Sequence, residues 1–240
     1  MADIYLSLII PSYNESRRIK KSLGTIYEYL RSQKYSYEVI LCDDGSNDST
    51  LCIAKDFSQG KSNFQILSLP HKGKGAAIKA GMIEARGKYR FMCDADLAMP
   101  VEQIKLFLTE LRKGCDIAIG SRELLDSQRY EEPKFRYFSG RIFNLFVKLV
   151  ALRKYRDTQC GFKCFSSEAA EKIFPLLKTD GWAFDVEALL LAERHGFLVS
   201  EIPIIWYHGG ESKVKFRSAV FQMAKDILFM RIRSLFSTHN

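Results

Sequence analysis

The first half of the sequence alternates between short, continuous apolar runs and segments with helical periodicity. The runs have the length and composition of strands buried on both faces, and the segments between them place apolar residues on one helix face. This alternation predicts an α/β fold, Rossmann-like, with a mainly parallel sheet and helices on both faces. The expected strands are 5–10, 37–44, 64–70, 89–96 and 115–121, and the expected helices are 15–33, 46–57, 73–85 and 101–114.

Polar clusters follow the apolar runs, at the point where each expected strand ends. In chain order they read PSYNE, DDGS, HKGKG, DAD and GSR. Ligands of open parallel sheets bind beyond the carboxyl ends of the strands. Because five successive strands deliver polar groups to that edge, we expect the binding site there.

The second half has a different pattern. Residues 134–152 are helical and unusually apolar, and 182–196 read as a helix that ends at a glycine. Residues 198–207 read as a strand whose Pro203 suggests an edge position. A basic amphipathic helix is expected over 215–236, and the segment 124–133 is expected to be a mobile loop.

Two aspartates, Asp94 and Asp96, follow the apolar run that ends at Cys93. On an extended segment residues i and i+2 point the same way, so both carboxylates are expected to face one point. Hard oxygen ligands suit Mg²⁺ or Mn²⁺, which keep water and bridge substrate phosphates. Alternatively, one aspartate caps the following helix, with Pro100 at an early position. This helix-cap explanation is reasonable for Asp96 alone but weak for the two aspartates together.

The DDGSNDST segment has a local and a functional interpretation. Ser46, Asn47 and Asp48 are most simply a turn and the cap of the next helix. Asp43 and Asp44, at the strand end, are harder to explain in that way.

The glycine- and lysine-rich turn HKGKG, from residue 71, opens a helix and can bind an anion. It lacks the spacing of a P-loop. Lys72 and Lys74 therefore fit either an anion site or a solvated surface.

Composition narrows the class of protein. The net charge of +8 favours a polyanionic partner: nucleic acid, nucleotide phosphates or an anionic membrane surface. The six cysteines include no CxxC pair and no zinc spacing, which predicts reduced thiols in a cytosolic protein. No apolar stretch reaches the roughly 18 residues of a membrane span, and no signal peptide is expected before the first strand.

Taken together and in this order, the five motifs resemble those of the family-2 glycosyltransferases, which have the GT-A fold. The segments DTQCGFKCF, WAFDVEALLLA, EIPIIW and ESKV are similar to the polyprenyl (dolichyl) phosphate sugar synthases, especially the dolichyl-phosphate beta-glucosyltransferase-like branch. The resemblance covers nearly the whole chain. It implies one GT-A domain over 1–240, with a nucleotide-sugar-binding half, 1–125, and an acceptor and membrane-interface half of C-terminal helices, 126–240.

The resemblance implies an inverting, metal-dependent transfer of a hexose from a nucleoside diphosphate sugar to a polyprenyl or dolichyl phosphate. UDP-glucose is the favoured donor and GDP-mannose the next, with Mg²⁺ or Mn²⁺ as cofactor. The enzyme would be a cytoplasmic, peripheral protein at the cytosolic face of a membrane, without a transmembrane helix.

The resemblance also implies roles for individual residues. Residues that bind the nucleotide-sugar would be Pro11, Tyr13, Glu15, Asp43, Lys74 and Asp94, and the metal ligands would be Asp94 and Asp96. The catalytic residues would be Arg122, whose planar guanidinium suits phosphate oxygens, and Asp157 on the acceptor side. The acceptor phosphate would be bound by Arg136 and Lys213.

One position departs from the mannosyl branch of these synthases. That branch commonly carries a glutamine two positions after the second aspartate, as a further metal ligand, and here the position is Ala98. Water or phosphate would complete the metal shell, which argues against a mannosyltransferase.

Three other classes fit parts of the sequence. Phosphatases of the haloacid dehalogenase type also use D-x-D, but on the first strand and with Thr or Val where this chain has Ala98. A nucleic-acid-binding protein would explain the charge, but acidic motifs occupy the strand ends, so no nucleic acid partner is expected. A cytosolic glycosyltransferase that acts on a saccharide hydroxyl has the same donor chemistry and remains open.

Residues 135–152 carry more apolar surface than one core face needs. A core helix explains Phe143, Val147 and Val150. The other apolar side chains, flanked by arginines and lysines, fit an interfacial helix on a membrane, and the basic helix 215–236 would add a second contact. A homodimer interface would explain the same surface.

Overall fold

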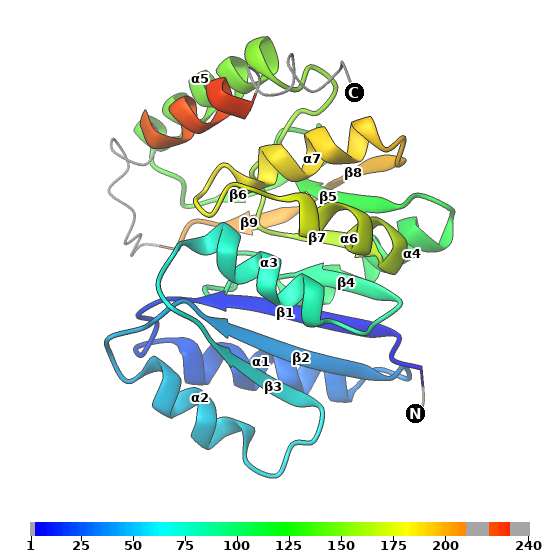
Figure 1. The fold of residues 1–240 in the computed structure, drawn as a ribbon. Coiled ribbons are helices and arrows are strands. Elements are labelled where there is room, and N and C mark those ends of the chain that lie inside the picture. The colour runs from blue at the N-terminus through cyan, green and yellow to red at the C-terminus, as the bar shows by residue number, and fades with distance from the viewer. Residues whose placement is uncertain (1–2, 210–220, 231–240) are drawn as a thin grey trace.

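The computed structural model describes residues 3–209 and 221–230, and its central feature is a seven-stranded sheet of order β3-β2-β1-β4-β7-β5-β8 (Figure 1). All five strands expected in the first half are present. Its strands are β1 (Leu6–Ser12), β2 (Tyr37–Asp43), β3 (Phe64–Ser68), β4 (Tyr89–Met92), β5 (Ile117–Ser121), β7 (Lys163–Ser166) and β8 (Val199–Pro203). The neighbours pair in parallel except at β7.

Helices cover both faces of this sheet, as the alternation predicted. One face carries α1 (Ile19–Arg31), α2 (Thr50–Ser58), the 3-10 turn η1 (Val101–Gln103) and α4 (Ile104–Arg112). The other carries α3 (Lys74–Glu84), α6 (Ser167–Ile173), the 3-10 turn η2 (Phe174–Leu176) and α7 (Phe184–Arg194).

The central strands are mostly apolar on both faces because successive side chains enter different cores. On β1, Ile9 packs into the core beneath α3, whereas Leu8 and Ile10 pack into the core beneath α1. A strand buried in this way favours apolar residues at consecutive positions, which is why the sequence shows continuous runs instead of alternation. The fold is therefore α/β, with a mainly parallel sheet between two helical layers.

The strand β7 is the main feature of the sheet that chain order does not suggest. It comes from the second half and inserts between β4 and β5, antiparallel to both; Cys164 pairs with Phe91 on one side and Ala118 on the other. The halves 1–125 and 126–240 thus share one sheet, since β7 and β8 both come from the second half.

The expected strand 198–207 is divided in two at Ile204. β8 lies at the edge of the sheet and ends at Pro203, the edge position that the proline suggested. The chain then continues as β9 (Ile205–Tyr207), which pairs with β6 (Gln128–Tyr130) in a separate two-stranded sheet. The expectation of a mobile loop over 124–133 is therefore wrong for the three residues of β6, because they pair with β9.

The helix α5 (Lys134–Val150) lies beside the helical segment 221–230 (Figure 1). Phe143 and Val147 of α5 are buried in the same core cluster as Met223, Ile227 and Met230. Of the terminal helix expected over 215–236, the described part is helical. None of the helices within 3–209 and 221–230 is long and apolar enough to cross a bilayer.

Candidate active site

A cleft of about 770 Å³ opens at the carboxyl ends of the strands, within the volume range of small-molecule sites. Most residues predicted for the donor and metal line it: Pro11, Tyr13, Glu15, Lys74, Asp94, Asp96 and Arg122. The sheet explains this convergence, because β1, β4 and β5 run in the same direction and end at one edge.

Lys74 begins α3 and forms an ion pair with Asp94, Nζ to Oδ1 at 2.5 Å. Its ammonium also lies 5.3 Å from the centre of the Trp182 ring. Burial alone lowers the pKa of a lysine, but the carboxylates of Asp94, Asp185 and Asp96 raise it above the ordinary value. Lys74 is thus a fixed cation beside the acidic pair and not a solvated surface residue.

The expectation that Asp94 and Asp96 lie on an extended strand is wrong, because β4 already ends at Met92. They lie in the following turn, where the Ala98 amide donates to Oδ1 of Asp96 at 3.0 Å. Both side chains nevertheless line the same cleft. The Asp96 side chain is exposed within the cleft, yet the protein atoms around its carboxylate, together with the negative charge of Asp94, raise its pKa.

This acidic pair fits a Mg²⁺ or Mn²⁺ ion. Two neighbouring carboxylates repel each other, and a divalent cation between them relieves that repulsion. Within the described residues no group of three or more His, Cys, Asp and Glu side chains could hold the ion. Water and diphosphate oxygens would then supply the other ligands, as Ala98 already indicated.

Gly161 leaves room for the Asp94 side chain. A Cβ atom at this glycine would lie 2.0 Å from Oδ2 of Asp94, far closer than a van der Waals contact. The segment that follows Asp157 therefore has to pass Asp94 without a side chain at this position.

Arg122, which follows β5, is bound by Asp157 through two parallel hydrogen bonds. Nε donates to Oδ2 at 2.7 Å and Nη2 donates to Oδ1 at 3.0 Å, and the Arg122 backbone N–H donates to Oδ2 at 3.0 Å. The described residues give Nη1 no hydrogen-bond partner, and Arg122 lines the cleft. Its remaining N–H groups can therefore bind an anion there.

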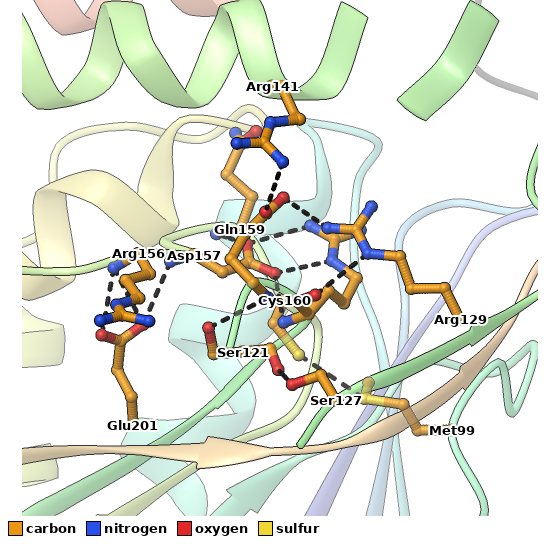
Figure 2. A network of polar contacts seen from close by, with 12 residues as sticks. Met99, Ser121, Ser127, Arg129, Arg141, Arg156, Asp157, Gln159, Cys160 and Glu201 are labelled. Carbon is orange, nitrogen blue, oxygen red and sulfur yellow. Dashed lines mark hydrogen bonds and ion pairs between the residues drawn. The ribbon is translucent and has the colours of Figure 1, made fainter. Parts of the chain in front are cut away.

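Asp157 is completely buried, and its own backbone is held in turn. The Arg156 and Asp157 amides donate to the Glu201 carboxylate at 2.9 and 3.1 Å (Figure 2). Burial raises the pKa of the Asp157 carboxyl, but the charge and hydrogen bonds of Arg122 outweigh it and lower the pKa to about 2. A carboxylate this acidic remains ionised at neutral pH, and its contact is with Arg122; it is absent from the cleft lining.

The two aspartates at the end of β2 have different surroundings. Asp43 is buried, accepts hydrogen bonds from the Ser46 amide and hydroxyl, and is not among the residues that line the cleft. Asp44 lines the cleft and accepts from the Lys72 and Gly73 amides at 2.8 and 3.0 Å. The geometry thus favours Asp44 over Asp43 for contact with a ligand.

The structure also describes Asp48 and the helix that contains Arg136. Asp48 accepts from the Thr50 amide at 2.9 Å, a local role at the start of α2, although the N-cap position itself is Ser49 and not the expected Ser46 or Asp48. Arg136 belongs to α5, and Lys213 lies outside the described residues.

Several cleft residues were not singled out from the sequence. The chain has two tryptophans, Trp182 and Trp206, and both line the cleft, each near one of its cations: Trp182 near Lys74, and Trp206 5.6 Å from the Arg122 guanidinium. His71 stacks on Tyr13 with ring centres 4.2 Å apart. The sequence did offer a signal for the two tryptophans: this residue is scarce in the chain, and both copies occur in motifs of the second half.

The model of glycosyl transferase family 2 matches residues 7–174. Similar full-length proteins are dolichyl-phosphate beta-glucosyltransferases. The one from Dictyostelium discoideum is 38% identical over 97% of this chain and 76% of its own length. The one from Homo sapiens is 36% identical over 96% of this chain and 76% of its own length.

Among solved structures, the fold is similar to glucosyl-3-phosphoglycerate synthase from Mycobacterium tuberculosis. One such structure, in complex with Mn²⁺, UDP and glucosyl-3-phosphoglycerate, has a TM-score of 0.70 and 17% identity, over 96% of this chain and 80% of that one. This likeness establishes the GT-A fold. Together with the family model and the relatives, it shows that the chain is a glycosyltransferase and belongs to family 2, in its dolichyl-phosphate glucosyltransferase-like group.

Proposed function

We propose that this glycosyltransferase moves glucose from UDP-glucose to dolichyl phosphate at a membrane surface, with Mg²⁺ or Mn²⁺ as cofactor. The observation that carries the proposal is the set of charges that line the cleft: the acidic pair Asp94 and Asp96 together with two fixed cations, Lys74, paired with Asp94, and Arg122, held by Asp157. A metal diphosphate is the ligand whose charges match this arrangement. The relatives named above support the sugar and the acceptor.

The donor would lie along the ends of β1 and β4. Tyr13, stacked on His71, and Pro11 and Glu15 line the part of the cleft proposed for the base and ribose. The diphosphate would then reach Lys74 and the acidic pair. A bound divalent ion there would stabilise the negative charge that builds on the leaving UDP.

The transfer is a single displacement at the anomeric carbon. An oxygen of the acceptor phosphate attacks that carbon from the side opposite UDP, so the new carbon–oxygen bond forms as the bond to the diphosphate breaks, and the configuration inverts. The guanidinium of Arg122 and the ammonium of Lys74 lie where they can stabilise the departing diphosphate by charge-assisted hydrogen bonds.

This displacement needs no general base. A phosphate monoester has a second pKa of about 6, so the acceptor already carries the negative charge that attacks. Asp157, buried and paired with Arg122, with a pKa of about 2, is not a proton acceptor at neutral pH. Its proposed role is to orient Arg122. Arg136 and Lys213 remain our proposed ligands of the incoming phosphate.

The membrane side is proposed from the outward surface of α5. Ile142, Leu145 and Leu149 form a stripe along the helix and are 70%, 56% and 67% exposed. Arg141 and Lys148 flank the stripe, as expected for a helix that rests on anionic lipid. A second copy of the chain could cover the same stripe, and the binding test in the Discussion distinguishes the two.

The proposal is tested by incubating the purified protein with labelled UDP-glucose, Mn²⁺ and dolichyl phosphate in mixed micelles, then measuring label in the organic extract. GDP-mannose and a free saccharide acceptor serve as competing substrates. We expect transfer to lipid from UDP-glucose and a kcat that is nearly flat from about pH 7 to 9, above the phosphate pKa. Transfer only to the saccharide, with a rate that rises steeply over this range, would contradict the acceptor assignment.

A further inference from the structure

Arg129, on β6, is an arginine outside the cleft whose guanidinium is bound on several sides. Nη1 donates to Glu132 at 2.8 Å and Nη2 to Glu123 at 2.5 Å, while Nε donates to the backbone carbonyl of Arg122 at 3.1 Å. The side chain is only 16% exposed, and it does not line the cleft. The network of which it is part is drawn in Figure 2, with Arg129 and Asp157 labelled.

This network fixes both polar groups of the Arg122 peptide backbone. The Arg122 N–H donates to Asp157, and the Arg122 carbonyl accepts from Arg129. The same Asp157 carboxylate holds the Arg122 side chain. The direction in which the free N–H groups of Arg122 point is thus set by an acidic side chain from one segment and a basic side chain from another.

Arg129 also connects this backbone to α5. Its guanidinium lies 5.3 Å from the centre of the Tyr137 ring. Arg141, one turn further along α5, donates to the Tyr137 hydroxyl at 2.8 Å and lies 3.9 Å from Glu123. Arg129 and Glu123, both in the segment between β5 and α5, therefore contact side chains of α5.

We propose that Arg129 is a positioning residue for glucosyl transfer: it holds the peptide of Arg122, and thereby directs the Arg122 guanidinium toward the diphosphate. The proposal rests on the role assigned to Arg122 under the proposed function. An arginine suits the task because its rigid plane of N–H groups binds three acceptors at once, two of them partly buried glutamates. A lysine has one donor centre and cannot bind all three in fixed directions.

The test is a double-mutant cycle between Arg122→Met and Arg129→Met, read as kcat for glucosyl transfer. In the wild-type background Arg129→Met is expected to lower kcat by between about tenfold and a hundredfold, the usual effect of a misplaced catalytic group. In the Arg122→Met background the same change is expected to lower kcat by less than about twofold, because the group it positions is gone. Arg129→Lys should restore part of the loss.

Arg86→Met is the matched control. Arg86 forms an arginine–carboxylate pair with Glu38 at 2.9 Å, near the amino end of β2 and away from the cleft. It is expected to affect the melting temperature but not kcat. If Arg129→Met does not fold, as judged by circular dichroism, the cycle is run with Arg129→Lys, which keeps a positive charge between the two glutamates.

Equal losses from the Arg129 change in both backgrounds would overturn the proposal, because a merely structural role is independent of Arg122. The outcome is separable from that of the proposed function. If the wild-type protein binds UDP with Mn²⁺ but transfers no glucose to dolichyl phosphate, the acceptor assignment fails. The double-mutant cycle is then repeated with UDP affinity, measured by calorimetry, in place of kcat. Additive losses of UDP affinity would again overturn the role of Arg129.

Discussion

The ammonium group of Lys74 lies 2.5 Å from Oδ1 of Asp94, the first aspartate of the acidic pair. The protein's own cation thus binds a carboxylate that is also a proposed metal ligand. A divalent ion at Asp94 and Asp96 would compete with Lys74 for this oxygen, and the displaced ammonium could turn to the diphosphate. Metal binding and donor binding are therefore expected to be coupled through Lys74.

Lys74→Met is expected to strengthen Mn²⁺ binding about tenfold in the absence of nucleotide, because Asp94 loses its competing cation. The same change should weaken UDP binding in the presence of Mn²⁺. Free Mn²⁺ can be followed by electron paramagnetic resonance and UDP by calorimetry. Lys72→Met removes an exposed lysine of the same turn and should change neither affinity appreciably. Weaker Mn²⁺ binding by Lys74→Met without nucleotide would contradict the competition.

Asp96→Asn is expected to abolish nearly all transfer without loss of stability. The raised pKa of Asp96 means that its charged form is disfavoured in the folded protein, so a neutral side chain should leave the melting temperature unchanged or higher. Product formation and thermal unfolding are measured on the same preparation. Full activity of the wild-type enzyme in excess EDTA would refute the metal site itself.

Gly161→Ala is expected to displace the Asp94 side chain, since the new methyl group would lie 2.0 Å from its Oδ2 atom. We expect kcat to fall by about a hundredfold, as for other small displacements of a catalytic centre. Gly24→Ala is the control, because a Cβ there meets nothing within 4 Å, and in helix α1 alanine should be neutral or stabilising. Unchanged kcat in Gly161→Ala would mean that Asp94 can move without consequence.

Asp157→Asn is expected to destabilise the fold in a pH-dependent way. The folded-state pKa of about 2 lies below the ordinary value of 3.8, so ionised Asp157 contributes roughly 2 kcal/mol above about pH 5. This contribution is lost as the pH falls from about 4 toward 2. Urea unfolding of wild type and variant should therefore differ most near neutral pH and converge in acid. A difference in the free energy of unfolding that stays constant over this pH range would show that the charge of Asp157, paired with Arg122, does not stabilise the fold.

Leu149→Glu is expected to weaken binding to vesicles that contain anionic lipid, since Leu149 is 67% exposed on the apolar stripe of α5. Phe146 is less suitable for substitution because it packs partly against the core. Leu106→Glu, on α4 at the opposite face of the sheet, is the control. Co-sedimentation measures binding, and sedimentation velocity measures self-association. Loss of a dimer with unchanged vesicle binding would assign the stripe to a second copy.

The sequence by itself determined the α/β class, the strands of the first half and the edge at which ligands bind. These follow from local periodicity: a strand buried on both faces is mostly apolar on both, as Leu8, Ile9 and Ile10 of β1 are, and parallel strands end at one edge. Asp94, Asp96 and Arg122 could be identified for the same reason, because all three lie just beyond the carboxyl end of such a strand.

Only the tertiary structure decided which side chains meet. Nothing local to Arg122 indicates that Asp157, 35 residues later, binds it on one side, or that the neighbouring Arg129 binds its carbonyl. The resemblance selected Asp43, whereas in the structure it is Asp44 that lines the cleft, and the insertion of β7 between β4 and β5 could not be foreseen either. Periodicity specifies the face of an element, whereas the partner of a polar side chain depends on how distant segments pack, and that information is spread over the whole chain.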